Sequence, residues 1–373
     1  MAGLFLALAL GCDPLAARPA IETNVDTCAW AALPSPGPLA AEAAVAAGPV
    51  ALAQVRIREA RLTYDPGYYT LAELALLCAS AQDPADAEAT RWMAYVDLQL
   101  HRFADAERRL LELGPHWQVQ LWLGDARMEQ GDLDGADAAY AAALDAHPGL
   151  EAYDRAAHLA WLRGDLALAL ELQRHAVSAA TPAEPEVMAW ALTHLGLYEA
   201  RAGLAPNGLG LALTVVPGYR PAELALGRWF LERGDHERAS RHLRAAGPTV
   251  EAARALREID PTTSVEAVSQ QDRRGYGLWL AATDPVRALP LLDAELAQRR
   301  DPATVIGRAW VAHLAGAEVD TDAVRAALAT GAADPALLLA AAEVLVDPTL
   351  AERAGAAPFG LLPSERARAA AFR

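Results

Sequence analysis

Three aspartates lie close together in one short stretch of the chain, where their carboxylates could ligate a divalent cation. The segment 131–137 reads GDLDGAD and contains Asp132, Asp134 and Asp137. A calcium loop of the EF-hand type needs its glycine at the sixth position and a glutamate at the twelfth. Here the glycine stands at 135, and no glutamate follows at the required distance. We therefore interpret the segment as turn and helix-capping chemistry, repeated at 164–165 and 234–235, and predict no metal site.

No catalytic signature is present in the sequence. It contains no GxSxG, HExxH or CxxC motif, no GKS or GKT of a phosphate-binding loop, and no GxGxxG after a strand. The nine histidines are scattered, and the nearest two, His236 and His242, are six residues apart, which places them on different sides of a helix. We predict a protein that is not an enzyme and binds no cofactor.

The N-terminus, MAGLFLALALGC, is an apolar run that ends in Gly11-Cys12. It is too short to cross a bilayer but long enough for the core of an export signal. It resembles a bacterial lipoprotein signal, in which the cysteine is lipidated and becomes the mature N-terminus. The resemblance predicts a signal over 1–12 with lipidation at Cys12, a Pro/Ala-rich tether over 13–38, and a place in the cell envelope, on the periplasmic side or at the outer membrane. The alternative is an apolar N-terminus on a cytoplasmic protein.

The other two cysteines, Cys28 and Cys78, form an even pair that an oxidising compartment would allow to bond. Spacing alone does not show that the two thiols approach within bonding distance. Cys78 lies in the apolar run LALLCA, so it could equally be a small buried hydrophobic residue.

Composition and charge restrict the class of partner. Aromatic residues make up only 6% of the chain, lysine is absent, and the net charge is −16 with a pI near 5.0. Nucleic-acid backbones and anionic membrane surfaces would be repelled by this charge. We predict no nucleic-acid partner and no membrane contact other than the lipid at Cys12.

Apolar residues recur at helical spacing from about residue 39 almost to the C-terminus. Prolines interrupt them at nearly constant intervals of 31, 33, 34, 35 and 31 residues, at Pro84, Pro115, Pro148, Pro182, Pro217 and Pro248. A glycine marks an inner turn in most intervals, so each unit reads as helix, turn, helix, proline. This organisation predicts an N-terminal helical cap over 39–83, a regular array over 84–248, and degenerate repeats with a C-terminal cap over 249–373.

The unit from 115 to 148 resembles a tetratricopeptide repeat, because it has Leu123-Gly124 in its first helix, Ala136 and Tyr140 in its second, and Pro148 at its end. Gly208 departs from the pattern, which expects alanine there. The resemblance implies an all-α, right-handed α-solenoid of helix-turn-helix repeats. It also implies that a protein or peptide binds a concave groove formed by the first helices. Carried onto this sequence, the groove positions are Arg91, Tyr95, Gln99, Asp125, Glu129, Asp154, His158, Trp161, Thr193, Arg201, Arg228 and Glu232.

These features favour a non-catalytic protein-interaction scaffold. One alternative is an accessory or regulatory subunit of an envelope enzyme or secretion complex, with a separate, non-repeating ligand site in 249–373. A continuous superhelix through residue 345 would count against that alternative. A cytosolic assembly factor of the same repeat type is the other.

Overall fold

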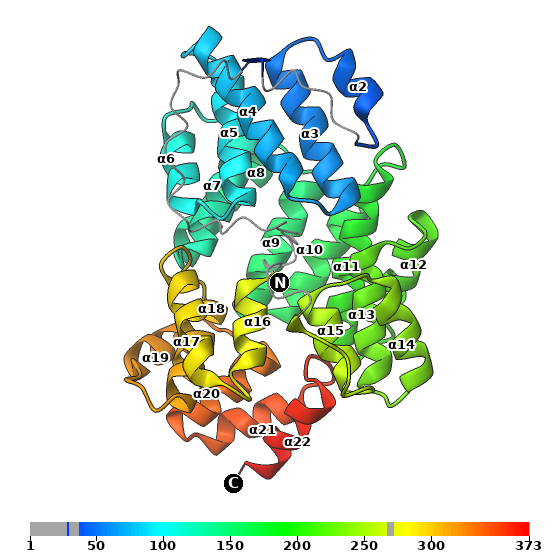
Figure 1. Cartoon of the computed structure of the whole chain (residues 1–373), viewed down its shortest axis with the longest axis vertical. Coiled ribbons are helices and arrows are strands. Elements are labelled where there is room, and N and C mark those ends of the chain that lie inside the picture. Colours follow the sequence, from blue (N-terminus) through cyan, green and yellow to red (C-terminus); the bar gives the residue numbers. More distant parts are fainter. Residues whose placement is uncertain (1–27, 30–36, 267–271, 373) are drawn as a thin grey trace. The chain divides into compact units, whose positions relative to one another are not determined.

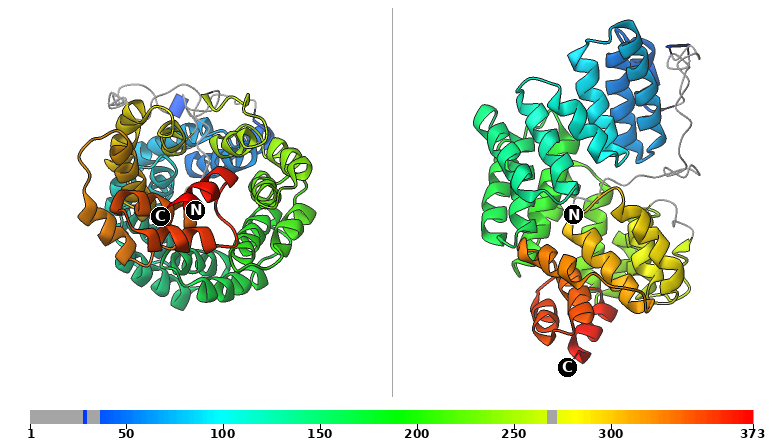
Figure 2. Two further views of the ribbon diagram at one scale, coloured as in Figure 1. Left: turned by 90° about the horizontal axis from the view of Figure 1, so that it is seen from below. Right: turned by 90° about the vertical axis from the view of Figure 1, so that its left-hand side faces the viewer.

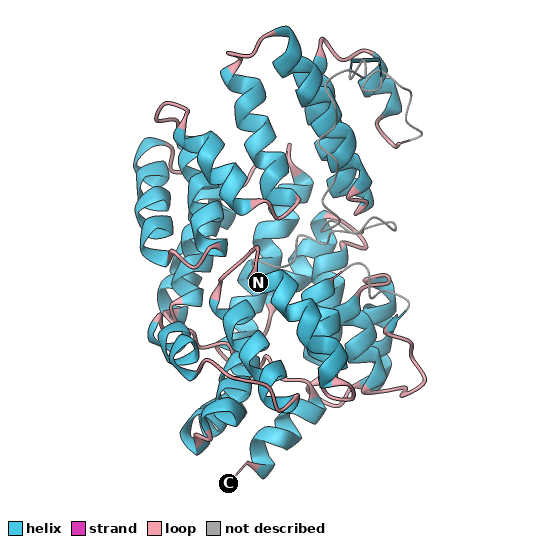
Figure 3. Cartoon of the chain, turned by 60° about the vertical axis from the view of Figure 1, so that its left-hand side comes forward, coloured by secondary structure: helices cyan, strands magenta, loops and turns pink. Residues whose placement is uncertain are grey.

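The structure is a computed structural model that describes residues 28–29, 37–266 and 272–372. Every regular element in these ranges is a helix, and they contain no strand (Figure 3). Successive helices pair into hairpins (Figure 1). The prediction of an all-α solenoid of helix-turn-helix repeats is therefore confirmed. The predicted signal, with its lipidation site at Cys12, lies outside the described residues.

The chain divides into two compact units, 2–139 and 140–373, at a point within α8. The division falls inside the segment 84–248 that the sequence predicts as one unbroken array. The N-terminal unit contains α2 (Ala40–Ala44), α3 (Pro49–Thr63), α4 (Gly67–Gln82), α5 (Ala87–Gln99), α6 (Phe103–Leu111), α7 (Trp117–Glu129) and the start of α8 (Leu133–Ala146).

The C-terminal unit holds the remaining helices. They are α9 (Leu150–Leu162), α10 (Leu166–Ser178), α11 (Pro185–Arg201), α12 (Asn207–Val215), α13 (Arg220–Leu231), α14 (His236–Ala245), α15 (Val250–Arg257), α16 (Arg273–Leu280), α17 (Pro285–Leu296), α18 (Pro302–Leu314), α19 (Thr321–Ala329), α20 (Pro335–Leu345), α21 (Pro348–Ala356) and α22 (Pro363–Ala371).

The first helices of successive hairpins contact one another and form a continuous row in each unit. In the N-terminal unit the row is α3, α5 and α7, and in the C-terminal unit it is α9, α11, α13 and α15. We call the surfaces of these rows the N-terminal and C-terminal first-helix faces. Hairpins continue beyond α15 as α16 with α17 and α20 with α21, joined through α18. Pairing of successive helices thus runs past residue 345.

The acidic turns at 131–132, 164–165 and 234–235 are helix caps. Gly131 has a φ of 85°, and the Asp132 carboxylate accepts a hydrogen bond from the backbone N–H of Gly135 at 2.9 Å. Asp165 and Asp235 accept from the backbone three residues further on in the same way, at 2.9 and 3.0 Å. The described residues contain no cluster of three or more potential metal ligands. The capping interpretation of the Gly-Asp pairs is confirmed.

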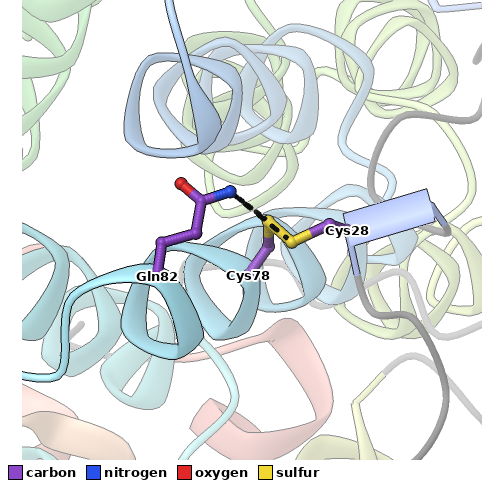
Figure 4. The surroundings of a disulfide bond; sticks show 3 residues. All are labelled: Cys28, Cys78 and Gln82. Carbon is purple, nitrogen blue, oxygen red and sulfur yellow. Dashed lines mark hydrogen bonds between the residues drawn. A yellow bond between two sulfur atoms is a disulfide. The ribbon is translucent and has the colours of Figure 1, made fainter.

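A disulfide joins Cys28 to Cys78 on α4 within the N-terminal unit (Figure 4). The Cα atoms of the two cysteines are 4.9 Å apart, and Gln82 donates to the sulfur of Cys78 at 3.4 Å. Cys78 is also buried, so it contributes to the core as well as to the bond. The bond closes a loop of 50 residues that includes α2 and α3.

The glycine at 208 has a packing reason. A Cβ added to Gly208 on α12 would lie 2.4 Å from the carbonyl oxygen of Leu192 and 2.5 Å from the backbone nitrogen of Gly196, both on α11. These neighbours are backbone atoms of a helix and cannot move aside independently. The departure from alanine therefore marks a closer approach of two helix backbones than alanine would permit.

Substituting Gly208 by alanine is expected to destabilise the C-terminal unit by about 1–3 kcal/mol, because overpacking outweighs the gain in helix propensity. Gly210, two residues along the same helix, has no atom within 4 Å of an added Cβ. Gly210→Ala is therefore the matched control and is expected to stabilise by about 0.5–1 kcal/mol. Urea denaturation followed by circular dichroism measures both, and a stabilising Gly208→Ala would contradict the close packing.

None of the helices in the described ranges combines the length and the apolar character needed to cross a bilayer.

Candidate protein-binding surface

An aromatic cluster occupies the N-terminal first-helix face. The rings of Trp92 and Tyr95 on α5 and Trp122 on α7 pack against one another with centroid separations of 5.0–5.7 Å. Arg61 on α3 donates to the Tyr95 hydroxyl at 2.6 Å, and its guanidinium lies 5.4 Å from the Tyr95 ring centre. The cluster ties the three first helices of the unit together.

The five groove positions predicted in this unit differ in accessibility. Tyr95, Gln99 and Glu129 are buried, whereas Arg91 and Asp125 are half-buried. A buried aromatic ring stabilises the array but offers little area to a partner. Polar contacts with a partner on this face would therefore fall to Arg91 and Asp125.

In the C-terminal unit, Asp154 on α9 is the centre of a buried hydrogen-bond network. Its carboxylate accepts from Gln173 Nε2 at 2.8 Å, from Trp190 Nε1 at 3.2 Å and from His194 Nδ1 at 2.8 Å. Gln173 also donates to the carbonyl oxygen of Ala191 at 2.9 Å. One carboxylate thus connects α9, α10 and α11.

Two opposing effects set the pKa of Asp154. Burial alone would raise it, but the adjacent His194 and the hydrogen bonds from His194 and Gln173 outweigh burial and hold the pKa below its ordinary value. His158, one turn further along α9, is buried, and burial lowers the pKa of its imidazole well below the usual range. The face therefore presents a stably charged carboxylate beside a neutral imidazole.

A row of aromatic and cationic groups continues from this network toward the end of α11. The His158 and Trp161 rings are 5.3 Å apart, the Trp161 and Tyr198 rings 6.3 Å apart, and the Arg201 guanidinium lies 4.3 Å from the Trp161 ring centre. Burial raises the pKa of the Tyr198 hydroxyl, which is without a hydrogen-bond partner in the described part of the chain. Thr193 is buried and donates to the carbonyl oxygen of Ala189 in its own helix.

Asp154 and His194 resemble the acid–base pair of a hydrolase, in which a carboxylate orients an imidazole beside a nucleophile. The imidazole has no such neighbour, because no serine, threonine or cysteine in the described ranges hydrogen-bonds to His194. The arrangement can hold helices in register and present polar and aromatic groups.

The chain's own C-terminal part lies against the C-terminal first-helix face, inside the curve of α9–α14 (Figure 2). Arg228 on α13 donates to the carbonyl oxygen of Gly360 at 3.3 Å, and the Glu232 carboxylate accepts from the N–H of Gly360 at 3.1 Å. Arg366 on α22 donates to Glu232 at 3.2 Å. Burial raises the pKa of Glu232 above its ordinary value, although Arg228, the Gly360 N–H and Arg366 oppose the shift.

Phe359 is the apolar anchor of this contact. Its side chain is 2% exposed and packs in a cluster with Leu197, Ala200, Leu209 and Ala225. Those four residues come from three helices of two adjacent hairpins, α11, α12 and α13. A single aromatic side chain therefore fills the gap between two repeats.

Further charged contacts flank the anchor. Arg201 donates to Asp334 at 3.5 Å, and Arg254 on α15 donates to Glu365 at 3.2 Å. The Ser364 N–H donates to Glu258 at 3.1 Å. Three of the predicted groove residues, Arg201, Arg228 and Glu232, thus contact residues 334–366 of the same chain.

The repeat pattern predicts neither His194 of the Asp154 network nor Phe359, the apolar anchor. His194 was not selected, although Trp190, His194 and Tyr198 recur at spacings of four and therefore lie on one side of a helix. Phe359 follows a proline and precedes a glycine in a segment without helical periodicity. An isolated aromatic residue in such a break is the one available sign of an anchor, but it does not identify its pocket.

No family model matches the chain, and no curated protein matches its sequence. Among solved structures, MamA is similar at 17% identity and a TM-score of 0.30, over 51% of this chain and 92% of MamA. A human IFIT1 dimer with PPP-AAAA is similar at 15% identity and a TM-score of 0.47, over 74% of this chain and 71% of IFIT1. A human IFIT1 dimer with m7Gppp-AAAA gives 14% identity and a TM-score of 0.44, over 74% and 70% of the two chains. The similarity concerns the helical fold, and nothing about partners follows from it.

Proposed function

We propose that this chain is a non-catalytic scaffold that binds a protein through an extended peptide segment on its first-helix faces. The observation that carries the proposal is the contact between α13 and Gly360. Both main-chain groups of Gly360 are hydrogen-bonded, to Arg228 and to Glu232, while the neighbouring Phe359 fills an apolar gap. Main-chain hydrogen bonds combined with one side-chain anchor are how grooves recognise extended peptides.

The proposal extends to location and to the class of partner. The lipoprotein-like signal supports an envelope protein anchored by lipid at Cys12, and the disulfide between Cys28 and Cys78 is of the kind that persists in an oxidising compartment. The net charge of −16 supports a protein partner over a nucleic acid. A short RNA titrated at physiological salt is expected to show no change in fluorescence anisotropy.

The N-terminal face provides the first test, because it carries half-buried charges of both signs. Arg91→Glu and Asp125→Arg are each expected to lower the amount of crosslinked partner recovered from envelope extracts at least tenfold, since a like charge now faces the partner. Asp105→Arg on α6, a second helix, is the control: its side chain is 45% exposed and paired only with Arg108 in the described contacts. Equal recovery with all three variants would refute binding on this face.

The predicted lipid attachment at Cys12 is tested separately. Cys12→Ser removes the thiol that lipid would occupy, and the protein is then expected to leave the membrane fraction and to lose the mass of the lipid. An unchanged mass and distribution would favour the cytosolic assembly factor.

A further inference from the structure

We propose that residues 357–362 are an internal ligand of the partner site on α11 and α13, and that a partner displaces them with a segment in which an aromatic residue precedes a glycine. This inference rests on the proposed peptide-binding function and adds the chemistry of the peptide and the way in which its site is regulated. It is drawn entirely from contacts within the C-terminal unit.

The segment is extended at its two ends, whereas residues 358–360 form a bend. It connects α21 to α22, and Ala357 and Leu362 have extended backbones, with φ near −63° and ψ of 133° and 157°. Pro358 lies within it and Pro363 follows it, and both limit its conformational freedom. A segment stiffened in this way costs little entropy to bind, which suits a ligand.

Two features define what the site accepts. The side chains packed around Phe359 are leucines and alanines together with the half-buried Trp229, and they leave the Phe359 ring 2% exposed. Gly360 has a φ of 126°, and a Cβ there would meet the ring of Pro335 at 3.1 Å. The position after the aromatic residue therefore requires glycine. Arg228 and Glu232 bind the main chain of Gly360, and the Arg228 guanidinium also lies 5.7 Å from the centre of the Phe359 ring, so the remaining specificity comes from the aromatic anchor.

The contacts around the anchor are largely polar. Besides the buried side chains of Phe359 and Leu361, they are hydrogen bonds and ion pairs, in which Arg201 donates to Asp334, Arg254 to Glu365 and the Ser364 N–H to Glu258. Polar interfaces within a chain are typical of parts that move relative to one another. Because it is tethered, the internal segment has an effective concentration in the millimolar range. It therefore lowers the apparent affinity of a partner segment for the same site, and only a partner segment that is abundant or binds tightly displaces it.

The probe for this inference is a fluorescent peptide of residues 356–366, AAPFGLLPSER, added to the full chain and followed by anisotropy. Phe359→Ala in the protein removes the internal anchor and leaves the pocket intact, so we expect the peptide to bind this variant at least tenfold more tightly than the wild type. Phe230→Ala is the matched control, because Phe230 is a phenylalanine of α13 that packs against His242 and Arg238 and is not part of the cluster around Phe359. Peptides with the phenylalanine or the glycine changed to alanine are expected to bind at least tenfold more weakly.

A crosslinked variant holds the internal segment in its site, and this test does not depend on loosening the fold. A Cβ at Gly203 would lie 3.6 Å from the Cβ of Pro358, within the range of about 3.5–4.5 Å that a disulfide spans. The oxidised Gly203→Cys, Pro358→Cys variant is expected to bind less peptide than the wild type, and mild reduction should restore binding. Gly203→Cys alone controls for the positive φ at that position.

Equal peptide affinity in the wild type and the Phe359→Ala variant, or undiminished binding by the oxidised double-cysteine variant, overturns the inference. Neither result bears on the crosslinking test of the N-terminal face, so the proposed scaffold function would still stand after either result. Conversely, the Phe359→Ala variant could bind the peptide while the Arg91 and Asp125 substitutions leave partner recovery unchanged. That pair of results would support the internal ligand and refute binding on the N-terminal face.

Discussion

Replacing Asp154 by alanine is expected to destabilise the C-terminal unit by about 3–5 kcal/mol at neutral pH. The carboxylate is buried and accepts three hydrogen bonds, from Gln173, Trp190 and His194. Its removal takes the carboxylate acceptor from all three donors, although Gln173 keeps its bond to the carbonyl oxygen of Ala191, and a buried polar group left unsatisfied costs about 1–3 kcal/mol. The free energy of unfolding in urea, followed by tryptophan fluorescence, measures the loss.

The contribution of Asp154 should also depend on pH. The pKa of Asp154 is held below its ordinary value in the folded chain, so the folded state binds its proton less tightly than the unfolded state does. The stabilisation is therefore present above the unfolded pKa of about 3.9 and is lost as pH falls through the lower folded value. The wild type should lose stability below about pH 4, and the Asp154→Ala variant should lose less over the same interval.

Asp165→Ala is the control for this measurement, because Asp165 caps α10 in the same unit through one hydrogen bond to Leu168 N–H. Loss of a cap costs about 1 kcal/mol. If Asp154→Ala costs no more than Asp165→Ala, the buried network does not hold the three helices together.

The repeat itself could be predicted from sequence because its signals are local. Gly131 and Asp132 end one helix and begin the next by contacts within a few residues, and the same pair recurs at 164–165 and 234–235. The period of the prolines then repeats the hairpin along the chain. Local chemistry was sufficient for the fold.

The contacts that groove positions make with the C-terminal part of the chain could not be predicted from local signals. Arg228 and Gly360 are 132 residues apart, and Arg201 and Asp334 are 133 residues apart. Whether such positions meet depends on how small rotations between repeats accumulate, and no single repeat specifies that sum. The repeat pattern selects these positions as facing an open groove, whereas seven of the twelve are buried. Burial came from neighbouring aromatic side chains, as at Tyr95, and from polar networks, as at Asp154.

Removing the disulfide between Cys28 and Cys78 is expected to destabilise the N-terminal unit by about 2–4 kcal/mol, because the bond closes a loop of 50 residues. The Trp92 and Trp122 rings, which pack against each other on α5 and α7, provide the fluorescence signal for this unit.

Separate substitutions distinguish the bond from core packing. Cys28 is half-buried and Cys78 is buried. Cys28→Ala therefore removes the bond with little effect on the core, and it should cost nearly as much as Cys78→Ala or as treatment of the wild type with reductant. If only Cys78→Ala destabilises the unit, Cys78 acts as a small core residue. Full loss on Cys28→Ala requires that the protein matured where thiols oxidise, and this would favour the envelope over the cytoplasm independently of the lipid at Cys12.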